Sequence, residues 1–198
     1  MNHDDTALFP VDTDTLTRLH HRLARTADAE GLLDVTYHLV DSPIGRLLLA
    51  ATDTGLVRVA FESEGVDRIL QDLATHLGPR ILADDTRLRT AATQLHEYFR
   101  GERREFDLPL DHRLSTGFRG TVHRILPRIG YGQTRSYSQV AALAGNPRAV
   151  RAVGTACATN PLPIVVPCHR VLRADGTTGG YVGGTDAKAT LLRLEKAA

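Results

Sequence analysis

Residues 35–61 read VTYHLVDSPIGRLLLAATDTGLVRVAF, three apolar runs separated by two short turns. The turns at 42–45 and 53–55 carry proline, glycine and aspartate, which tight turns favour. The runs are rich in valine, leucine and aromatic residues and have the length of strands. Strands joined by such short connections pair antiparallel, so the segment predicts a meander. The predicted strands are 35–40, 46–51 and 56–61.

The segments after the meander predict the rest of a small domain. Apolar residues recur at helical spacing over 66–77 and 86–99. Residues 106–110 predict a last strand before a polar linker at 111–116. We therefore expect an N-terminal α/β domain with an antiparallel sheet over residues 34–110.

Residues 1–33 precede this domain as an extension and predict one helix. Asp14 is placed to cap that helix, and Gly31 is placed to end it. Residues three or four positions apart share a helix face. The apolar face of this helix consists of Leu16, Leu19 and Leu23.

The chain after the linker predicts a mainly helical domain over residues 111–198. Ser136 is placed as the N-cap of one helix, and Asn146 and Pro147 as the N-cap and first turn of the next. The tight glycine-asparagine turn between these two helices predicts a helix-turn-helix motif. The predicted helices are 117–129, 137–144 and 148–159.

Charge separates the two predicted domains. Residues 1–110 carry 12 lysines and arginines against 19 aspartates and glutamates, whereas residues 111–198 carry 12 against 4. A basic half indicates a polyanionic partner such as nucleic acid, although basic surfaces can also be simply solvated. Two cysteines argue against a disulfide framework and favour the cytoplasm. The N-terminus lacks the apolar run of a signal peptide, and no segment has the length of a membrane span.

The helix predicted at 148–159 has a face of small side chains. Ala149, Ala152 and Ala156 share this face, and Arg148 and Arg151 flank it. Such a face packs closely against another helix or against the floor of a narrow groove. The arginines favour the groove, because arginine can reach from the DNA minor groove toward the base stack.

Pro167-Cys168-His169-Arg170 places a thiol beside a base and a cation. A free cysteine is either a small buried hydrophobe or, with such neighbours, a nucleophile. In an extended strand Cys168 and His169 point to opposite faces, so a proton relay through a water is easier than a direct pair. Glu195 is a candidate to hold the imidazole, and the alternative is a solvated charge at a helix end.

We expect no metal site. Cys157 and Cys168 lack the paired spacing of structural zinc ligands, and Cys157 is expected in the core. The loop at 179–184, GGYVGG, lets the backbone approach a ligand closely. It lacks the Gly-Lys-Ser/Thr ending of a phosphate loop, so a nucleoside triphosphate site is not indicated.

In this order, the motifs resemble those of the O6-alkylguanine-DNA alkyltransferases, the methylated-DNA–protein-cysteine methyltransferases. The resemblance runs from about residue 34 to residue 195. It implies an α+β fold, with an N-terminal ribonuclease H-like domain followed by a helical domain that carries the helix-turn-helix. The matching positions are the 42–45 hairpin, Ser136-Tyr137, Gly145-Asn146-Pro147, Arg151-Ala152-Val153-Gly154, Asn160-Pro161, Pro167-Cys168-His169-Arg170-Val171, the 179–184 loop, Lys188, Leu191-Leu192 and Glu195.

The resemblance implies a DNA repair enzyme that flips out O6-alkylguanine, and also O4-alkylthymine, and moves the alkyl group to Cys168. The product is a thioether, which thiol exchange cannot reverse, so each molecule acts once and needs no cofactor. His169 would take the thiol proton through a water, and Glu195 would orient His169. Asn160 would tether the preceding helix to the active-site segment.

The implied partner is double-stranded DNA that bears O6-alkylguanine, bound through its minor groove by a monomer, with cooperative binding left open. Arg151 would replace the extruded base, while Tyr137 would crowd the adjoining phosphate and bond to the guanine. The residues implied against the minor groove are Arg148, Ala149, Ala152 and Gly154. The residues implied around the alkylguanine are Tyr137, Pro163, Val171, Tyr181 and Val182.

Three features depart from the family pattern. Val182 stands where several relatives have serine, His123 stands where tryptophan is frequent, and residues 4–33 have no counterpart in the core pattern. We interpret His123 as a packing change. Two rival functions are a non-catalytic alkyl-lesion binder and a helix-turn-helix regulator. The presence of Cys168 argues against the first, and the lack of an effector domain argues against the second.

Overall fold

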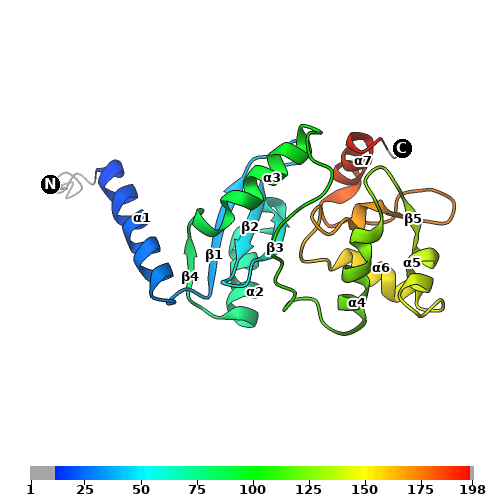
Figure 1. Cartoon of the computed structure of the whole chain (residues 1–198), viewed down its shortest axis with the longest axis horizontal. Helices are drawn as coiled ribbons and strands as arrows, with labels where there is room; N and C mark the ends of the chain where they lie inside the picture. Colours follow the sequence, from blue (N-terminus) through cyan, green and yellow to red (C-terminus); the bar gives the residue numbers. More distant parts are fainter. Residues whose placement is uncertain (1–11, 197–198) are drawn as a thin grey trace, which may run out of the picture.

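The computed structural model describes residues 12–196, which form two domains side by side with one further helix at the N-terminal end (Figure 1). The N-terminal domain is built on a four-stranded sheet of order β3-β2-β1-β4. The predicted meander is confirmed, because β1 pairs antiparallel with β2 and β2 with β3. The strands are β1 (Val35–Val40), β2 (Leu47–Ala51), β3 (Leu56–Phe61) and β4 (Ile81–Ala83).

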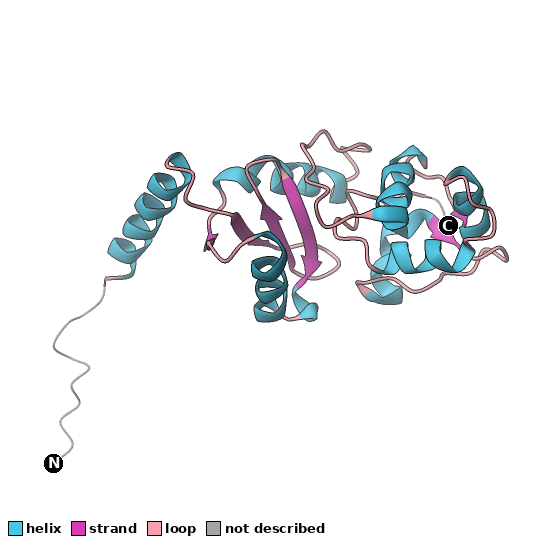
Figure 2. Ribbon diagram, turned by 90° about the horizontal axis from the view of Figure 1, so that it is seen from below, coloured by secondary structure: helices cyan, strands magenta, loops and turns pink. Residues whose placement is uncertain are grey.

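The sheet is mixed, not antiparallel as the meander alone predicts. The short strand β4 pairs parallel with β1, and Val35 lies opposite Ile81. A parallel partner needs a crossover connection. Here the crossover is helix α2 (Val66–Leu77), which covers one face of the sheet (Figure 2).

The other face of the sheet is covered by helix α3 (Arg89–Phe99) and by the helical domain. Leu47, Leu49 and Phe61 of this face belong to the same buried cluster as side chains of the helical domain. A turn of 3-10 helix, Thr86–Leu88, leads into α3, and another, Glu62–Glu64, follows β3. The two domains therefore share one continuous apolar core.

The predicted strand at 106–110 is wrong. Only Leu110 makes a single bridge, to Leu56. The backbone N–H of Leu56 donates to the Pro109 carbonyl, and that of Val59 donates to the Pro161 carbonyl of the helical domain. The outer edge of β3 is thus covered by irregular chain, which prevents pairing with another molecule.

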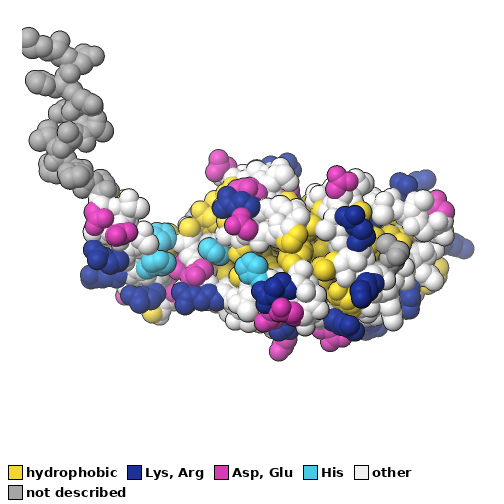
Figure 3. All heavy atoms as spheres, turned by 90° about the horizontal axis from the view of Figure 1, so that it is seen from above, with side chains coloured by type: hydrophobic (Ala, Val, Ile, Leu, Met, Phe, Trp, Pro, Cys, Tyr) yellow, Lys and Arg dark blue, Asp and Glu magenta, His cyan; other side chains and the backbone are white. Residues whose placement is uncertain are grey.

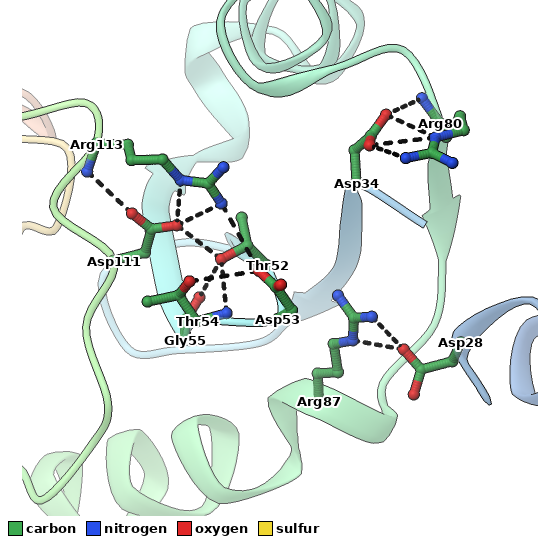
Figure 4. A network of polar contacts seen from close by, with 10 residues as sticks. All are labelled: Asp28, Asp34, Thr52, Asp53, Thr54, Gly55, Arg80, Arg87, Asp111 and Arg113. Atoms are coloured by element: carbon green, nitrogen blue, oxygen red, sulfur yellow. Dashed lines mark hydrogen bonds and ion pairs between the residues drawn. The ribbon is translucent and has the colours of Figure 1, made fainter. Parts of the chain in front are cut away.

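The predicted linker begins with a buried carboxylate. Asp111 is 2% exposed and accepts from the Thr52 hydroxyl at 2.7 Å and from the Arg113 guanidinium (Figure 4). Arg113 also approaches Asp53, at 3.9 Å. These contacts attach the start of the linker to the turn between β2 and β3.

Helix α1 (Thr13–Ala29) confirms the single helix predicted in the extension, but Asp12 caps it rather than Asp14. Its leucine face, Leu16, Leu19 and Leu23, is more than half exposed. The helix is attached to the sheet domain by an ion pair between Asp28 and Arg87 and by His20, which donates to the Ala83 carbonyl. Basic and histidine side chains gather at this end of the molecule (Figure 3). Residues 1–11 of the predicted extension lie outside the described residues.

The helical domain places α4 and α5 against α6. The Ser136 N-cap is confirmed, since its hydroxyl accepts from the Gln139 N–H and the Gln139 side chain accepts from the Ser136 N–H. The Asn146 cap is wrong. Helix α6 begins two residues later than predicted, after Ala149. The elements are α4 (Gly117–Ile125), the 3-10 turn Leu126–Arg128, β5 (Arg135–Ser136), α5 (Tyr137–Leu143), α6 (Val150–Ala158), the 3-10 turn Cys168–Arg170, β6 (Val171–Leu172) and α7 (Gly184–Leu194).

His123 of α4 fills the position that the sequence marks as a packing change, and it is 2% exposed. Its Nδ1 lies 2.8 Å from the Ser115 hydroxyl, and its Nε2 lies 2.8 Å from the Ala156 carbonyl. Burial lowers the pKa of His123. The neutral ring therefore joins the linker to α6 through both nitrogens.

Among residues 12–196, no helix combines the length and hydropathy that crossing a membrane would require.

Gly55 is the turn residue whose replacement is expected to damage the domain junction. Its φ is +148°, and a Cβ built there would lie 2.2 Å from the Pro109 carbonyl oxygen. We expect Gly55→Ala to lower the free energy of unfolding by about 3 kcal/mol, measured by urea denaturation. Gly45→Ala is the control, because Gly45 also has a positive φ but a Cβ there meets nothing within 4 Å. Equal losses would contradict the role of the Pro109 contact.

Candidate active site

The segment between α6 and α7 is folded back into the core. Residues 160–171 are all buried. Ile164 has a φ of +75°, a strained value for a β-branched residue. Cys168–Arg170 forms a 3-10 turn, so Cys168 and His169 do not lie in an extended strand.

Asn160 holds this segment together from inside. Its side-chain oxygen accepts from the Leu162 N–H at 3.0 Å, and its amide nitrogen donates to the Val166 carbonyl at 2.7 Å. The same nitrogen lies 3.1 Å from the Cys168 sulfur. The Asn160 side chain therefore fixes the backbone of the 160–168 segment and also contacts the Cys168 thiol.

The carboxylate of Glu195, at the end of α7, gathers donors from several segments. Arg170 binds it through two nitrogens, with Nε 2.9 Å from Oε2 and Nη2 2.8 Å from Oε1. His169 Nε2 lies 3.0 Å from Oε1, and the Gly132 N–H donates to Oε2 at 3.3 Å. The predicted pairing of Glu195 with His169 is thus present in the geometry, and the solvated alternative is excluded because Glu195 is 2% exposed.

The charge of Glu195 is balanced by Arg170, with which it forms a buried ion pair. Burial by itself would raise the pKa of Glu195, but hydrogen bonds from His169 and Arg170 lower it to about 2. Burial lowers the pKa of His169, although the bond to Glu195 acts in the opposite direction. The imidazole is therefore neutral at pH 7, and the carboxylate beside it assigns the proton to Nε2.

That assignment leaves Nδ1 of His169 with a free lone pair. Nδ1 is buried and has no hydrogen-bond partner among residues 12–196. A neutral imidazole whose Nε2–H is held by a carboxylate can accept a proton at Nδ1. His169 is therefore arranged as a base.

The thiol of Cys168 is 1% exposed and protonated at rest. Burial raises its pKa to about 11, while the Asn160 amide and the Lys188 ammonium act in the opposite direction. At pH 7 only roughly one thiol in ten thousand is ionised at such a pKa. Nucleophilic attack consequently needs a base to remove the proton.

Lys188 is a buried cation near the Cys168 segment. It is one of the positions that match the family motifs, but the sequence assigns it no role. It is fully buried in α7, and its Nζ donates to the Val171 carbonyl at 2.7 Å. Burial lowers the pKa of Lys188. Its position three and four residues before the buried Leu191 and Leu192 is the signal that places it on the inward face.

Two glycines of the 179–184 loop lie close against side chains of the protein, whereas Gly180 and Gly184 have open space beside them. A Cβ at Gly179 would lie 2.2 Å from the Tyr137 hydroxyl, and one at Gly183 would lie 2.2 Å from the Phe61 ring. The Tyr181 ring packs edge-on to His169, with centroids 6.4 Å apart. The loop therefore brings Tyr181 next to His169, and Val182 is half-buried against the shared core.

The predicted DNA-contacting residues lie apart from this buried centre, on the outer side of the helix-turn-helix. Arg148, Arg151 and Ala152 are exposed, and Ala149 and Gly154 are half-buried. A Cβ built at Gly154 meets nothing within 4 Å, so packing within the protein does not require glycine there. Ala156, on the predicted small face, is fully buried and faces the core instead.

A cavity of about 500 Å³ lies between α2 and the chain around Arg113 and Arg119. Cys168 does not line it. Pro163 is buried within the 160–171 segment. Among residues 12–196, no group of three His, Cys, Asp or Glu side chains is placed to hold a metal ion.

Comparison with known proteins matches both domains to one family. Residues 35–112 match the model described as "6-O-methylguanine DNA methyltransferase, ribonuclease-like domain", and residues 117–197 match its "DNA binding domain". A methylated-DNA–protein-cysteine methyltransferase of Mycolicibacterium paratuberculosis is 46% identical over 82% of this chain and 93% of its own length. The constitutive enzyme of Bacillus subtilis is 40% identical over 81% and 94%, respectively.

Solved structures agree with these matches. The crystal structure of Mycobacterium tuberculosis OGT in complex with DNA is similar with a TM-score of 0.72 and 41% identity, over 82% of this chain and 93% of that one. The M. tuberculosis O6-methylguanine methyltransferase is similar with a TM-score of 0.73 and 40% identity, over the same shares. The expected α+β fold, with a ribonuclease-like domain followed by a helical domain, is confirmed.

The Glu195 charge is expected to stabilise the folded protein in a pH-dependent way. Glu195→Gln leaves the Arg170 guanidinium buried without its counter-charge, so we expect a loss of about 3 kcal/mol at pH 7 in urea unfolding. Because the folded pKa is below the ordinary value of 4.5, the stabilisation is complete above about pH 5 and is lost as pH falls toward 2. The difference between wild type and variant should therefore narrow over this range.

Glu64→Gln is the control for this prediction. Glu64 pairs with Arg58 at 2.8 Å, but both side chains are more than a fifth exposed. Removing such a pair is expected to cost no more than about 1 kcal/mol. A difference between wild type and Glu195→Gln that stays constant from pH 7 to pH 3 would contradict the ionised, buried carboxylate.

Proposed function

The chain belongs to the 6-O-methylguanine DNA methyltransferase family, and we propose that it repairs DNA by moving an alkyl group from O6 of guanine to the thiol of Cys168. The observation that carries this proposal is the Asn160-Cys168-His169-Glu195 arrangement, a buried thiol beside a neutral base. The same chemistry would extend to O4-alkylthymine.

The first step is loss of the thiol proton. The proton would pass through one water to Nδ1 of His169, the ring nitrogen that has its lone pair free. The imidazolium formed would be stabilised by Glu195, which stays ionised because Arg170 is paired with it. Asn160 and Lys188 would stabilise the thiolate, through a donated hydrogen bond and a positive charge.

The second step is direct displacement at the alkyl carbon. A bond forms between the Cys168 sulfur and that carbon, and the bond from the carbon to O6 breaks. The electron pair stays on the guanine, which takes up a proton and departs as the normal base. The thioether is stable to thiol exchange, so the molecule acts once. The step uses no cofactor.

The guanine would occupy a pocket bounded by the Cys168 segment and the 179–184 loop. We assign Tyr137, Pro163, Tyr181 and Val182 to its walls. The guanine amino group would donate to the carbonyls of Cys168 and Val171. The Val171 carbonyl already accepts from Lys188, and a carbonyl oxygen has a second lone pair for the guanine.

The protein binds DNA, and we propose that α6 enters the minor groove. The exposed Arg151 would fill the space of the extruded nucleotide, which offsets part of an unstacking cost of a few kcal/mol. Arg148 would contact the backbone, while Ala149, Ala152 and Gly154 would let the helix approach the groove closely. The net positive charge of residues 111–198 fits a salt-sensitive interaction.

We further propose a monomer that works in the cytoplasm. The proposed domain boundaries are residues 34–110 for the N-terminal domain and 111–198 for the domain that binds DNA and accepts the alkyl group. Residues 1–33 would form an extension outside both. Residues 197 and 198 of the second domain lie outside the described part of the chain.

A stoichiometric adduct is the direct test of this proposal. After incubation with a duplex that contains O6-methylguanine, intact-mass measurement should show one added methyl group per molecule, and peptide mapping should place it on Cys168. Cys157→Ser is the control and should still be methylated. An unmodified Cys168 in folded protein that binds the lesion would indicate the non-catalytic binder instead.

Arg151→Ala separates base flipping from chemistry. Since Arg151 would act only on the duplex, we expect the repair rate of O6-methylguanine in double-stranded DNA to fall by about tenfold or more, whereas reaction with free O6-benzylguanine should stay near wild type. Both rates are measured by mass spectrometry under single-turnover conditions. Equal losses on the two substrates would refute the flipping role.

A further inference from the structure

Tyr98 reaches the active site from the N-terminal domain. It lies in α3, 97 positions before Glu195, and its side chain is fully buried. Its hydroxyl donates to Oε1 of Glu195 at 2.7 Å. This oxygen is the one that His169 also contacts, at 3.0 Å.

The hydroxyl of Tyr98 is not needed for packing. The ring lies within 6.2 Å, centroid to centroid, of Phe99, Phe106 and Tyr131, and a phenylalanine would keep these aromatic contacts. Among residues 12–196, Glu195 is the one hydrogen-bond partner of the hydroxyl. Burial raises the pKa of Tyr98, so the hydroxyl remains a donor at all working pH values.

We propose that Tyr98 is a positioning residue for alkyl transfer, which holds Oε1 of Glu195 toward His169 and so makes the N-terminal domain part of the active site. The proposal rests on the proposed function of Cys168 and His169. Among residues 12–196 the Tyr98 hydroxyl bonds to Glu195 and not to the thiol, so it acts through the carboxylate.

The two oxygens of the Glu195 carboxylate differ in the number of donors that they accept from. Oε1 accepts from Tyr98, His169 and Arg170, whereas Oε2 accepts from Arg170 and Gly132. Without the tyrosine donor, the carboxylate is free to turn toward Arg170 and Gly132. His169 then loses a fixed orientation for its Nδ1 lone pair.

Loss of the hydroxyl also concentrates negative charge on Oε1. The imidazole would then bind its proton more tightly, so the acidic limb of the rate profile should move to higher pH. Substitution at Tyr98 leaves the other charged groups near the His169 imidazole unchanged. The shift of the acidic limb therefore reports on the contact between Glu195 and His169. The charged and titratable groups that face His169 are Glu195, Arg170, Lys188, Cys168 and Tyr181.

The test is Tyr98→Phe in the full chain. Single-turnover rates are measured from pH 5.5 to 9 with free O6-benzylguanine and with a duplex that contains O6-methylguanine. We expect rates about tenfold lower at pH 7 on both substrates, because the substitution removes a hydrogen bond to a charged group. The acidic limb of the pH–rate profile should shift to higher pH. The affinity for lesion-free duplex should not change.

Thr52→Val is the matched control. Thr52 is also a buried hydroxyl that donates, at 2.7 Å, to a buried carboxylate paired with an arginine (Figure 4). That carboxylate, Asp111, makes no contact with the Cys168 segment. Thr52→Val should lower the unfolding midpoint by an amount similar to Tyr98→Phe, and it should leave the rate and its pH dependence at wild-type values.

Two outcomes would overturn the proposal. One is a folded Tyr98→Phe protein with the wild-type rate and pH profile. The other is a rate loss without a shift of the acidic limb, matched by Thr52→Val, because both changes would then act only through stability. Failure of the proposed function is distinct, since the wild-type protein would then acquire no alkyl group on Cys168.

Discussion

The buried negative charge of Glu195 is the constraint on which the active site depends. An ionised carboxylate cannot remain in an apolar core without donors, and here five hydrogen bonds reach its two oxygens. These donors come from α3, from the loop after α4 and from the Cys168–Arg170 turn. One charge at the end of α7 thus forces three other segments to meet.

The presence of Arg170 in this network changes what His169 can do. Burial lowers the pKa of His169, and the nearby Arg170 cation acts in the same direction, against the opposing effect of Glu195. His169 therefore stays neutral and keeps a lone pair at Nδ1. The same burial holds the Cys168 thiol protonated at rest, and a protonated, buried thiol is slow to oxidise.

Much of the local structure could be predicted. The meander follows from its turns, the start of α5 follows from the Ser136 capping box, and the burial of Lys188 follows from its spacing to Leu191. The predictions that were wrong also have a physical cause. The sequence could not reveal that β4 adds to the sheet in parallel, or that the Cys168 segment turns instead of extending, because both depend on contacts with distant chain.

The sequence by itself determined the residues of the candidate site, a thiol, a base and a carboxylate in ordered motifs. It also determined the elements that short-range hydrogen bonds and periodicity produce. Only the tertiary structure decided which side chains donate hydrogen bonds to the Glu195 carboxylate. Tyr98 and Glu195 are 97 positions apart and His169 and Glu195 are 26 apart, so no local pattern records their contact. Only the common core of the two domains brings the Tyr98 hydroxyl to the same oxygen as the imidazole.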